Sequence, residues 1–185
     1  MSNKYKKQTK TNPLNRIYLV GFMGVGKSTL GRKLAKQLDL EFIDLDDIFE
    51  QKYKISIDSF FNKYDEELFR KLEHEMLLET FLKSNAVIST GGGTPCYHNA
   101  MEKINSVGYS IYIKMPPAAI VHRLSTAKKK RPLIKGIPKE ELLSVIQEKL
   151  NGRHPIYKQA QLHVNGIEVD IKKLASNISE KIKSD

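Results

Sequence analysis

A glycine-rich stretch near the start of the chain has the residue types and spacing that bind the phosphates of a nucleotide. Residues 21–28 read Gly-Phe-Met-Gly-Val-Gly-Lys-Ser, which is the pattern G-x-x-x-x-G-K-S. Glycines let successive backbone N–H groups turn toward phosphate oxygens without a Cβ in the way. Lys27 would reach the β- and γ-phosphates, and the Ser28 hydroxyl would hold Mg²⁺. The stretch therefore predicts binding of a nucleoside triphosphate.

The residues on either side place this stretch between a strand and a helix. Residues 17–20 form a short apolar run typical of a buried parallel strand, and residues 30–38 have the apolar spacing of a helix. That context distinguishes a phosphate-binding loop from a glycine-rich turn that only happens to precede a helix. The start of the helix adds the positive end of its dipole. We therefore favour the phosphate-binding loop.

Two carboxylates follow the second predicted strand, residues 41–45. Asp44 and Asp46 are two positions apart, so their side chains point to the same side if strand geometry continues through Asp46. One would then act on a metal ion through its water shell and the other on a substrate hydroxyl. In the alternative interpretation, Asp46 is only the N-cap of the next helix. We favour the functional role, because an unpaired carboxylate at the end of an apolar strand would be costly.

Three glycines, Gly91, Gly92 and Gly93, end the third predicted strand, residues 86–90, where no acidic residue lies. Many other phosphate-loop proteins have a magnesium-binding aspartate after a later strand. Because none follows this strand, we expect Asp44 to bind magnesium instead. The glycines would present bare backbone N–H groups to the γ-phosphate and to an acceptor molecule. A plain flexible turn is the alternative.

Three arginines are further candidates, although none of them is specific by itself. Arg70 and Glu73 are three positions apart in a long amphipathic stretch, where such a pair is commonly exposed and contributes little. Arg131 ends the basic run 128–131, in a stretch typical of a mobile loop that closes over phosphates. Arg153 closes a predicted helix, which is a common place for a cation.

Short strand-like segments alternate with longer helix-like ones along the whole chain. The remaining predicted strands are 109–115 and 162–164, and the remaining helices are 46–53, 65–83, 98–106, 117–125, 138–150 and 171–182, with a short turn at 57–61. This alternation predicts a three-layer α/β fold, a five-stranded parallel sheet with helices on both faces. Ligands of such sheets bind at the carboxyl ends of the strands, where the candidate residues lie.

The composition is that of one folded domain with two local basic segments. The chain has 185 residues, 40% hydrophobic and 28% charged, and we expect one domain at 14–185. The net charge of +10 resides in residues 1–16 and 128–135, which carry ten cations and no acid. A nucleic-acid-binding protein would rather spread basic residues over a face with aromatic residues between them. We therefore expect no nucleic-acid partner and interpret residues 1–13 as a disordered, solvated tail.

The sequence also predicts a cytoplasmic protein with no membrane partner. No apolar run approaches the length that crosses a bilayer, and the N-terminus lacks the apolar core of a signal peptide. The single cysteine, Cys96, cannot form an internal disulfide, which fits a reducing compartment. No motif pairs Cys96 with a base, so we expect an inert thiol.

Taken together, these stretches resemble shikimate kinase. The matching pieces follow one another from about Ile17 to the end of the chain: the phosphate loop, Asp44-x-Asp46, Phe69-Arg70-x-x-Glu73, Gly91-Gly92-Gly93, Arg131-Pro132-Leu133 and Arg153-x-x-x-Tyr157. The resemblance implies a sheet of the nucleoside monophosphate kinase type. It also implies a monomer that uses ATP and Mg²⁺ to phosphorylate the 3-hydroxyl of shikimate, on the route to chorismate and the aromatic amino acids.

The resemblance implies a role for each matching residue. Lys27, Asp46 and Arg131 would be catalytic, with Asp46 assisting removal of the proton from the attacking hydroxyl. The residues implied for ATP are Gly24, Val25, Gly26, Lys27, Ser28, Thr29 and Arg131. Those implied for shikimate are Asp46, Arg70, Gly91, Gly92, Gly93 and Arg153, with both arginines binding its carboxylate. Mg²⁺ would bind to Ser28 and Asp44. Glu73 would orient the arginines. The resemblance further implies a substrate-binding segment at about 46–75, a lid at about 126–138, and adenine contacts from Arg123 and about Asn165–Glu168.

Two other functions remain open from the sequence. Another small-molecule or nucleotide kinase of the same fold would bind a different acceptor, and Asp46 with the arginine pair argues against it. A nucleic-acid-binding ATPase would use the basic segments instead. A steep salt dependence of DNA or RNA binding that survives deletion of residues 1–13 would support that second function.

Overall fold

Five short strands form one parallel sheet in the part of the chain that the computed structural model describes, residues 16–127, 134 and 136–184. The strands are β1 (Arg16–Val20), β2 (Glu41–Asp44), β3 (Ala86–Ser89), β4 (Tyr109–Lys114) and β5 (Leu162–Asn165). They lie in the order β2-β3-β1-β4-β5, and each neighbouring pair is parallel. Every residue of β1 and β3 is buried, as expected of strands covered on both faces.

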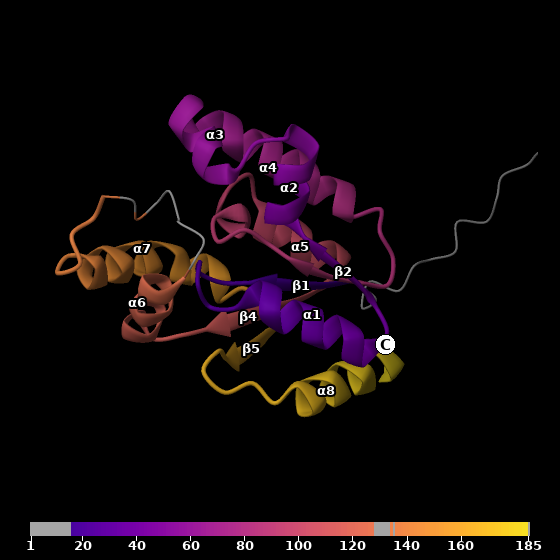
Figure 1. The fold of residues 1–185 in the computed structure, drawn as a ribbon. Coiled ribbons are helices and arrows are strands. Elements are labelled where there is room, and N and C mark those ends of the chain that lie inside the picture. Colours follow the sequence, from indigo (N-terminus) through magenta and orange to yellow (C-terminus); the bar gives the residue numbers. More distant parts are fainter. Residues whose placement is uncertain (1–15, 128–133, 135, 185) are drawn as a thin grey trace, which may run out of the picture.

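Helices cover both faces of this sheet (Figure 1). They are α1 (Lys27–Leu38), α2 (Leu45–Tyr53), α3 (Ile57–Lys63), α4 (Glu66–Thr80), α5 (Ala100–Val107), α6 (Pro117–Thr126), α7 (Leu142–Tyr157) and α8 (Ile171–Ser184), with a 3₁₀ turn η2 (Thr94–Cys96). In Figure 1, α1 and α8 lie together on one face of the sheet, α5 lies on the opposite face, and α6 packs against α7. The predicted fold class, a three-layer α/β fold around a five-stranded parallel sheet, is confirmed.

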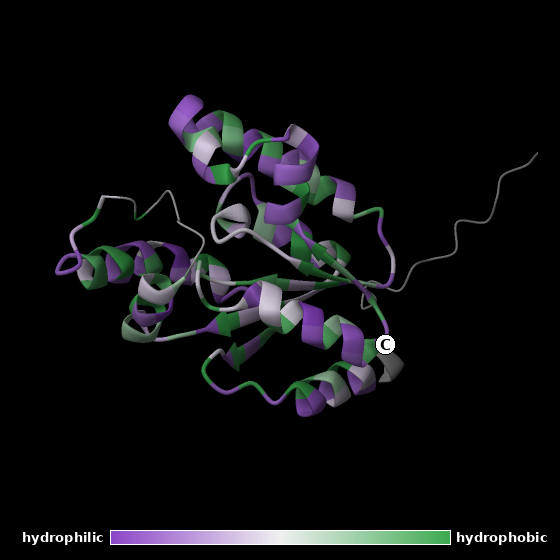
Figure 2. Ribbon diagram, in the orientation of Figure 1, coloured by the Kyte–Doolittle hydropathy of each residue, from purple (hydrophilic) through white to green (hydrophobic). Residues whose placement is uncertain are grey.

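The apolar spacing of α1 explains how this helix packs against the sheet. In α1, Leu30, Leu34 and Ala35 are buried on one face, at the spacing that a helix needs for a single apolar stripe. Figure 2 shows the strands mostly in the hydrophobic colour, whereas hydrophilic residues line the outer sides of α1 and α8. None of the helices in the described ranges is both long and apolar enough to cross a bilayer.

One segment that we expected to be a turn is a helix. Residues 57–61 begin α3 (Ile57–Lys63), and Ser56 caps it by accepting a backbone hydrogen bond of 3.1 Å. Phe60 then packs against Phe49 and Phe69, with ring centroids 5.1 and 5.9 Å apart. A cap and an aromatic cluster stabilise a helix that is too short for a periodic pattern to reveal.

The end of α7 also differs from the prediction. The helix was expected at 138–150, but it runs from Leu142 to Tyr157 with Pro155 inside it. The residue before a proline is disfavoured in helical conformation, so the sequence indicates an earlier end. Contacts of Arg153 and Tyr157 with the carbonyl of Gly92 outweigh that local preference. The additional residues, 151–157, therefore bring two side chains to the loop after β3.

The basic segments lie largely outside the described residues. This holds for the expected tail, residues 1–13, and for the run 128–131. Arg16, which we counted with the first segment, opens β1 and is only 8% exposed. Its guanidinium donates hydrogen bonds to the carbonyls of Val107, Phe81 and Lys83 at 2.7, 2.8 and 3.1 Å. Arg16 is therefore a structural residue and not part of a solvated tail.

Candidate active site

The phosphate-binding loop has the conformation that its glycines permit. Gly24 and Gly26 have φ angles of 81° and 94°, a region that residues with a Cβ rarely adopt. The helix α1 starts at Lys27, three residues earlier than predicted, so the last residues of the motif form its first turn. The first N–H groups of a helix have no partner within the helix and carry partial positive charge. The loop and first turn thus form a site suited to anions.

The side chain of Lys27 folds back over the loop that precedes it. Its ammonium group donates to the carbonyls of Gly21 and Phe22 at 2.8 and 2.9 Å, and the residue is 8% exposed. These two bonds fix the ammonium group at the wall of a cavity that we call the phosphate cavity. It is lined by Met23, Gly24, Gly26, Lys27, Ser28, Thr29, Asp44, Asp46, Ser89, Thr90 and Gly92.

The two carboxylates both line the phosphate cavity, but not through the geometry that we expected. The strand β2 ends at Asp44, and α2 begins at Leu45, so strand alternation does not reach Asp46. Asp44 itself is the N-cap of α2, because its carboxylate accepts a hydrogen bond of 3.1 Å from the backbone N–H of Asp46. The expectation of a continued strand is therefore wrong, and so is the alternative that Asp46 is the cap.

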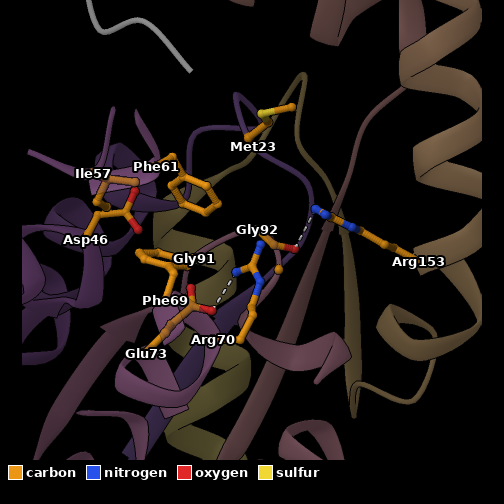
Figure 3. Close-up of a pocket in the computed structure, with 11 residues that line it drawn as sticks. Met23, Asp46, Ile57, Phe61, Phe69, Arg70, Glu73, Gly91, Gly92 and Arg153 are labelled. Carbon is orange, nitrogen blue, oxygen red and sulfur yellow. Dashed lines mark hydrogen bonds and ion pairs between the residues drawn. The ribbon is translucent and has the colours of Figure 1, made fainter. Parts of the chain in front are cut away.

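A second cavity, which we call the acceptor cavity, shares lining residues with the phosphate cavity, and Figure 3 shows the residues that line it. It collects the predicted acceptor-binding residues from segments that are far apart in the sequence. Its lining is Met23, Asp46, Ile57, Phe61, Phe69, Arg70, Glu73, Gly91, Gly92, Gly93 and Arg153. Apolar side chains from α3 and α4 line this cavity together with charged groups, a combination that suits a small polar molecule with an apolar ring face.

Arg70 is held firmly in this cavity by two carboxylates. Its Nη1 donates to Glu73 Oε2 at 2.7 Å, and its Nη2 and Nε donate to Glu66 Oε1 at 2.9 and 3.1 Å. The side chains of Arg70 and Glu73 are only 6% and 5% exposed. The interpretation that their spacing alone favours, an exposed ion pair, is therefore wrong. Burial opposes the charge of Arg70, but Glu73 and Glu66 outweigh it and raise the pKa of the guanidinium. The cation is thus kept charged inside a buried site.

Glu73 is held as firmly as the arginine. Its Oε1 accepts a hydrogen bond of 2.7 Å from the hydroxyl of Thr94, while its Oε2 accepts from Arg70. Burial raises the pKa of the Glu73 carboxyl, and Arg70 and Thr94 partly oppose that effect. Both oxygens are therefore engaged by neighbouring side chains, and the contact with Arg70 agrees with the expected orienting role.

Arg153 reaches the same cavity from α7. Its Nη1 lies 3.3 Å from the carbonyl oxygen of Gly92, and its guanidinium lies over the ring of Phe22 at 5.5 Å from the centroid. Figure 3 shows the guanidinium groups of Arg70 and Arg153 on either side of Gly92. The structure thus brings together both arginines, which are separated by more than eighty residues in the sequence.

The two cavities share part of their walls. Met23, Asp46 and Gly92 line both of them. Of these three residues, Asp46 carries the side chain that can accept a proton. A molecule in the acceptor cavity would therefore lie next to phosphates in the phosphate cavity, with a carboxylate at the boundary.

A third cavity also adjoins the phosphate-binding loop. Val25, Gly26 and Thr29 line it together with Arg123, Gly166 and Ile167. Arg123 donates to the carbonyls of Val25 and Gly166 at 3.0 and 3.2 Å. The arginine and the loop near 165–168, which the resemblance places at adenine, are therefore in contact beside the phosphate-binding loop.

One predicted site residue lies outside the described part of the chain, and two residues that hold the site were not predicted from the sequence. Arg131 lies outside the described residues, as does most of the expected lid. Sequence reasoning missed Glu66 and Thr94, which hold Arg70 and Glu73. Glu66 precedes Arg70 by four positions, a helical spacing that indicates an ion pair. Thr94 gives no comparable signal, because its contact depends on how the loop after β3 folds.

A phosphate-binding loop after the central strand of this sheet, with an acceptor cavity beside it, defines a P-loop kinase of the nucleoside monophosphate kinase type. The chain belongs to the shikimate kinase family, whose family model matches residues 23–183.

Individual relatives agree with this assignment. The shikimate kinase of Phocaeicola vulgatus is 39% identical over 160 residues, which cover 86% of this chain and 91% of that protein. The crystal structure of the enzyme from Bacteroides thetaiotaomicron matches with a TM-score of 0.83 at 37% identity, over 91% of this chain and 98% of that one. The shikimate kinase of Acinetobacter baumannii, solved in complex with shikimate, matches with a TM-score of 0.81 at 32% identity, over 94% and 95% of the two chains.

Proposed function

We propose that this chain transfers the γ-phosphoryl group of ATP to the 3-hydroxyl of shikimate, giving shikimate 3-phosphate on the route to chorismate and the aromatic amino acids. The observation that carries the proposal is the acceptor cavity, which places two arginines and Asp46 around one space and shares its wall with the phosphate cavity. Membership of the shikimate kinase family supports the same reaction. The proposed substrate-binding segment is about 46–75.

The carboxylate of shikimate would bind between Arg70 and Arg153. A guanidinium has five N–H donors, and three of those on Arg70 are used by Glu66 and Glu73 within the described part of the chain. The remaining two lie on Nη1 and Nη2, the pair that suits a carboxylate. The apolar wall formed by Ile57, Phe61 and Phe69 would cover the ring. Gly91, Gly92 and Gly93 would approach the substrate through their backbone.

The chemical step would take place at the shared wall. The 3-hydroxyl oxygen would form a bond to the γ-phosphorus as the bond to the β-phosphate oxygen breaks, and Asp46 would accept the hydroxyl proton. The N–H groups at Gly24, Val25, Gly26, Ser28 and Thr29 would hold the phosphates with Lys27. Arg131, on a lid at about 126–138, would add positive charge to the transferring group and exclude water.

The oxygen ligands for Mg²⁺ would come from Ser28 and Asp44. Both residues line the phosphate cavity, and hydroxyl and carboxylate oxygens are the ligands that Mg²⁺ prefers, so the residues fit the ion. When bound, the ion would neutralise charge on the phosphates. The adenine ring would lie in the third cavity, beside Arg123 and the loop near Asn165–Glu168.

Alanine at Arg153 or at Arg70 is expected to raise the KM for shikimate by about 10- to 100-fold, because each change removes charge-assisted hydrogen bonds to the carboxylate. The KM for ATP should change little. Steady-state kinetics with each substrate varied in turn will measure both values. Arg32→Ala is the matched control, because that arginine is exposed and its contacts, an ion pair of 3.1 Å with Asp47 and the ring of Phe42, involve none of the residues that line the acceptor cavity. Variants that weakened ATP alone would show that the arginines do not clamp shikimate.

The proposed physiological state is a cytoplasmic monomer with no nucleic-acid or membrane partner. The free Cys96 supports a reducing compartment, and burial raises the pKa of its thiol, which disfavours reactivity. A DNA or RNA affinity that falls steeply with salt, in protein lacking residues 1–13, would contradict the absence of a nucleic-acid partner.

A coupled ADP-release assay tests the proposed function. ADP should form only when shikimate is added, and the rate should saturate with shikimate concentration. An ADP-release rate that is the same with and without shikimate would contradict the proposal.

A further inference from the structure

One peptide group separates the two arginines of the acceptor cavity. The carbonyl of Gly92 accepts a hydrogen bond from Arg153, as Figure 3 shows. On the other side, the guanidinium of Arg70 packs directly on Gly93, where a Cβ would come within 2.5 to 2.7 Å of its terminal atoms. The position of the Gly92–Gly93 peptide therefore sets how the two guanidinium groups lie relative to each other.

A buried tyrosine holds this peptide from behind. Tyr157 is the last residue of α7 and is 0% exposed, and its hydroxyl donates a hydrogen bond to the same carbonyl of Gly92. It follows Arg153 by four positions, so both side chains leave the same face of the helix. Burial raises the pKa of the Tyr157 phenol well above its ordinary value, so the hydroxyl keeps its proton and remains a donor.

We propose that Tyr157 is a positioning residue for shikimate binding, which it supports by anchoring the carbonyl of Gly92 and thereby fixing the spacing of Arg70 and Arg153. This inference rests on the proposed function. Tyr157 lies behind the wall of the acceptor cavity and acts through other residues. Without its hydroxyl, Arg153 is the remaining side-chain donor to that carbonyl among the described residues. The arginine is then drawn toward the peptide, and the peptide is freer to rotate.

The test is the substitution Tyr157→Phe, which removes one oxygen and keeps the ring. The KM for shikimate is expected to rise about five- to tenfold, as for the loss of one hydrogen bond in the binding assembly. The KM for ATP and kcat should stay within about threefold of the unmodified enzyme. Tyr112→Phe is the matched control: that tyrosine is also buried, its ring lies 5.2 Å from that of Tyr157, and its hydroxyl pairs with His154 at 3.2 Å. It should leave the KM for shikimate unchanged.

A double-mutant cycle separates positioning from a general effect on folding. If Tyr157 acts through Arg153, then Tyr157→Phe in the Arg153→Ala background should raise the KM for shikimate by less than about twofold, because the two changes are coupled. Thermal unfolding of all variants gives the accompanying change in Tm. Additive effects in the cycle, or a lowered Tm with no change in the KM for shikimate, would overturn the inference.

The same experiments distinguish this inference from the proposed function. If the unmodified protein shows no shikimate-dependent release of ADP, both are wrong. If Arg153→Ala raises the KM for shikimate and Tyr157→Phe behaves like Tyr112→Phe, the proposed function stands and only the role of Tyr157 is refuted.

Discussion

Replacement of Asp46 with asparagine is expected to lower kcat by about 10²- to 10⁴-fold, the range typical of a lost general base. Asp46 is at the boundary of the two cavities, where the attacking hydroxyl and the γ-phosphate would meet. Asparagine has nearly the same size but cannot accept the proton. The measurement is the steady-state rate at saturating ATP and shikimate, and the KM for shikimate should change by a smaller factor than kcat.

The neighbouring aspartate provides the control for this prediction. Asp47 lies on the same turn of α2, but it is half exposed and pairs with Arg32 at 3.1 Å. Asp47→Asn removes the same charge one position away from the proposed centre, and kcat should stay close to that of the unmodified enzyme. Equal kcat values for the Asp46→Asn and Asp47→Asn variants would exclude Asp46 as the proton acceptor.

Substitution of Arg131 by alanine is expected to lower kcat by about 10²- to 10³-fold, as for the loss of one donor aimed at developing charge. The proposed assignment rests on the motif Arg131-Pro132-Leu133, because a transferring phosphoryl group needs positive charge, which the proposed lid would supply. Rapid-quench measurement of phosphoryl transfer in a single turnover will separate this step from release of product.

Lys139 is a suitable control for Arg131, because it is an exposed cation just beyond the proposed lid. Lys139→Ala removes one positive charge from the same region, so a purely long-range effect of charge would slow both variants alike. An unchanged rate of phosphoryl transfer in Arg131→Ala would remove Arg131 from the mechanism.

The parts of the site that depend on local geometry could be predicted from the sequence. A strand, a glycine-rich loop and a helix form one continuous segment, so the pattern at residues 21–28 was enough to place Lys27 and Ser28 in the phosphate cavity. The parallel sheet was equally predictable, because its strands are buried on both faces and read as short apolar runs. The ends of β1, β2 and β3 then had to meet.

The parts that depend on packing could not be derived in the same way. Arg70 and Glu73 have the spacing of an exposed pair, and only the resemblance to a family indicated a ligand-binding role for Arg70. Their burial results from the loop after β3, which closes over α4 and supplies Thr94. The position of Tyr157 on α7 could not be predicted either, because Pro155 indicates that the helix has already ended.

A crystal structure of this protein with shikimate and ADP tests the central claim most directly. We expect the shikimate carboxylate to lie between Arg70 and Arg153, and its 3-hydroxyl to lie within hydrogen-bonding distance of Asp46 and to face the phosphate cavity. Shikimate bound with its carboxylate away from both arginines, or with its 3-hydroxyl turned away from Asp46, would contradict the account.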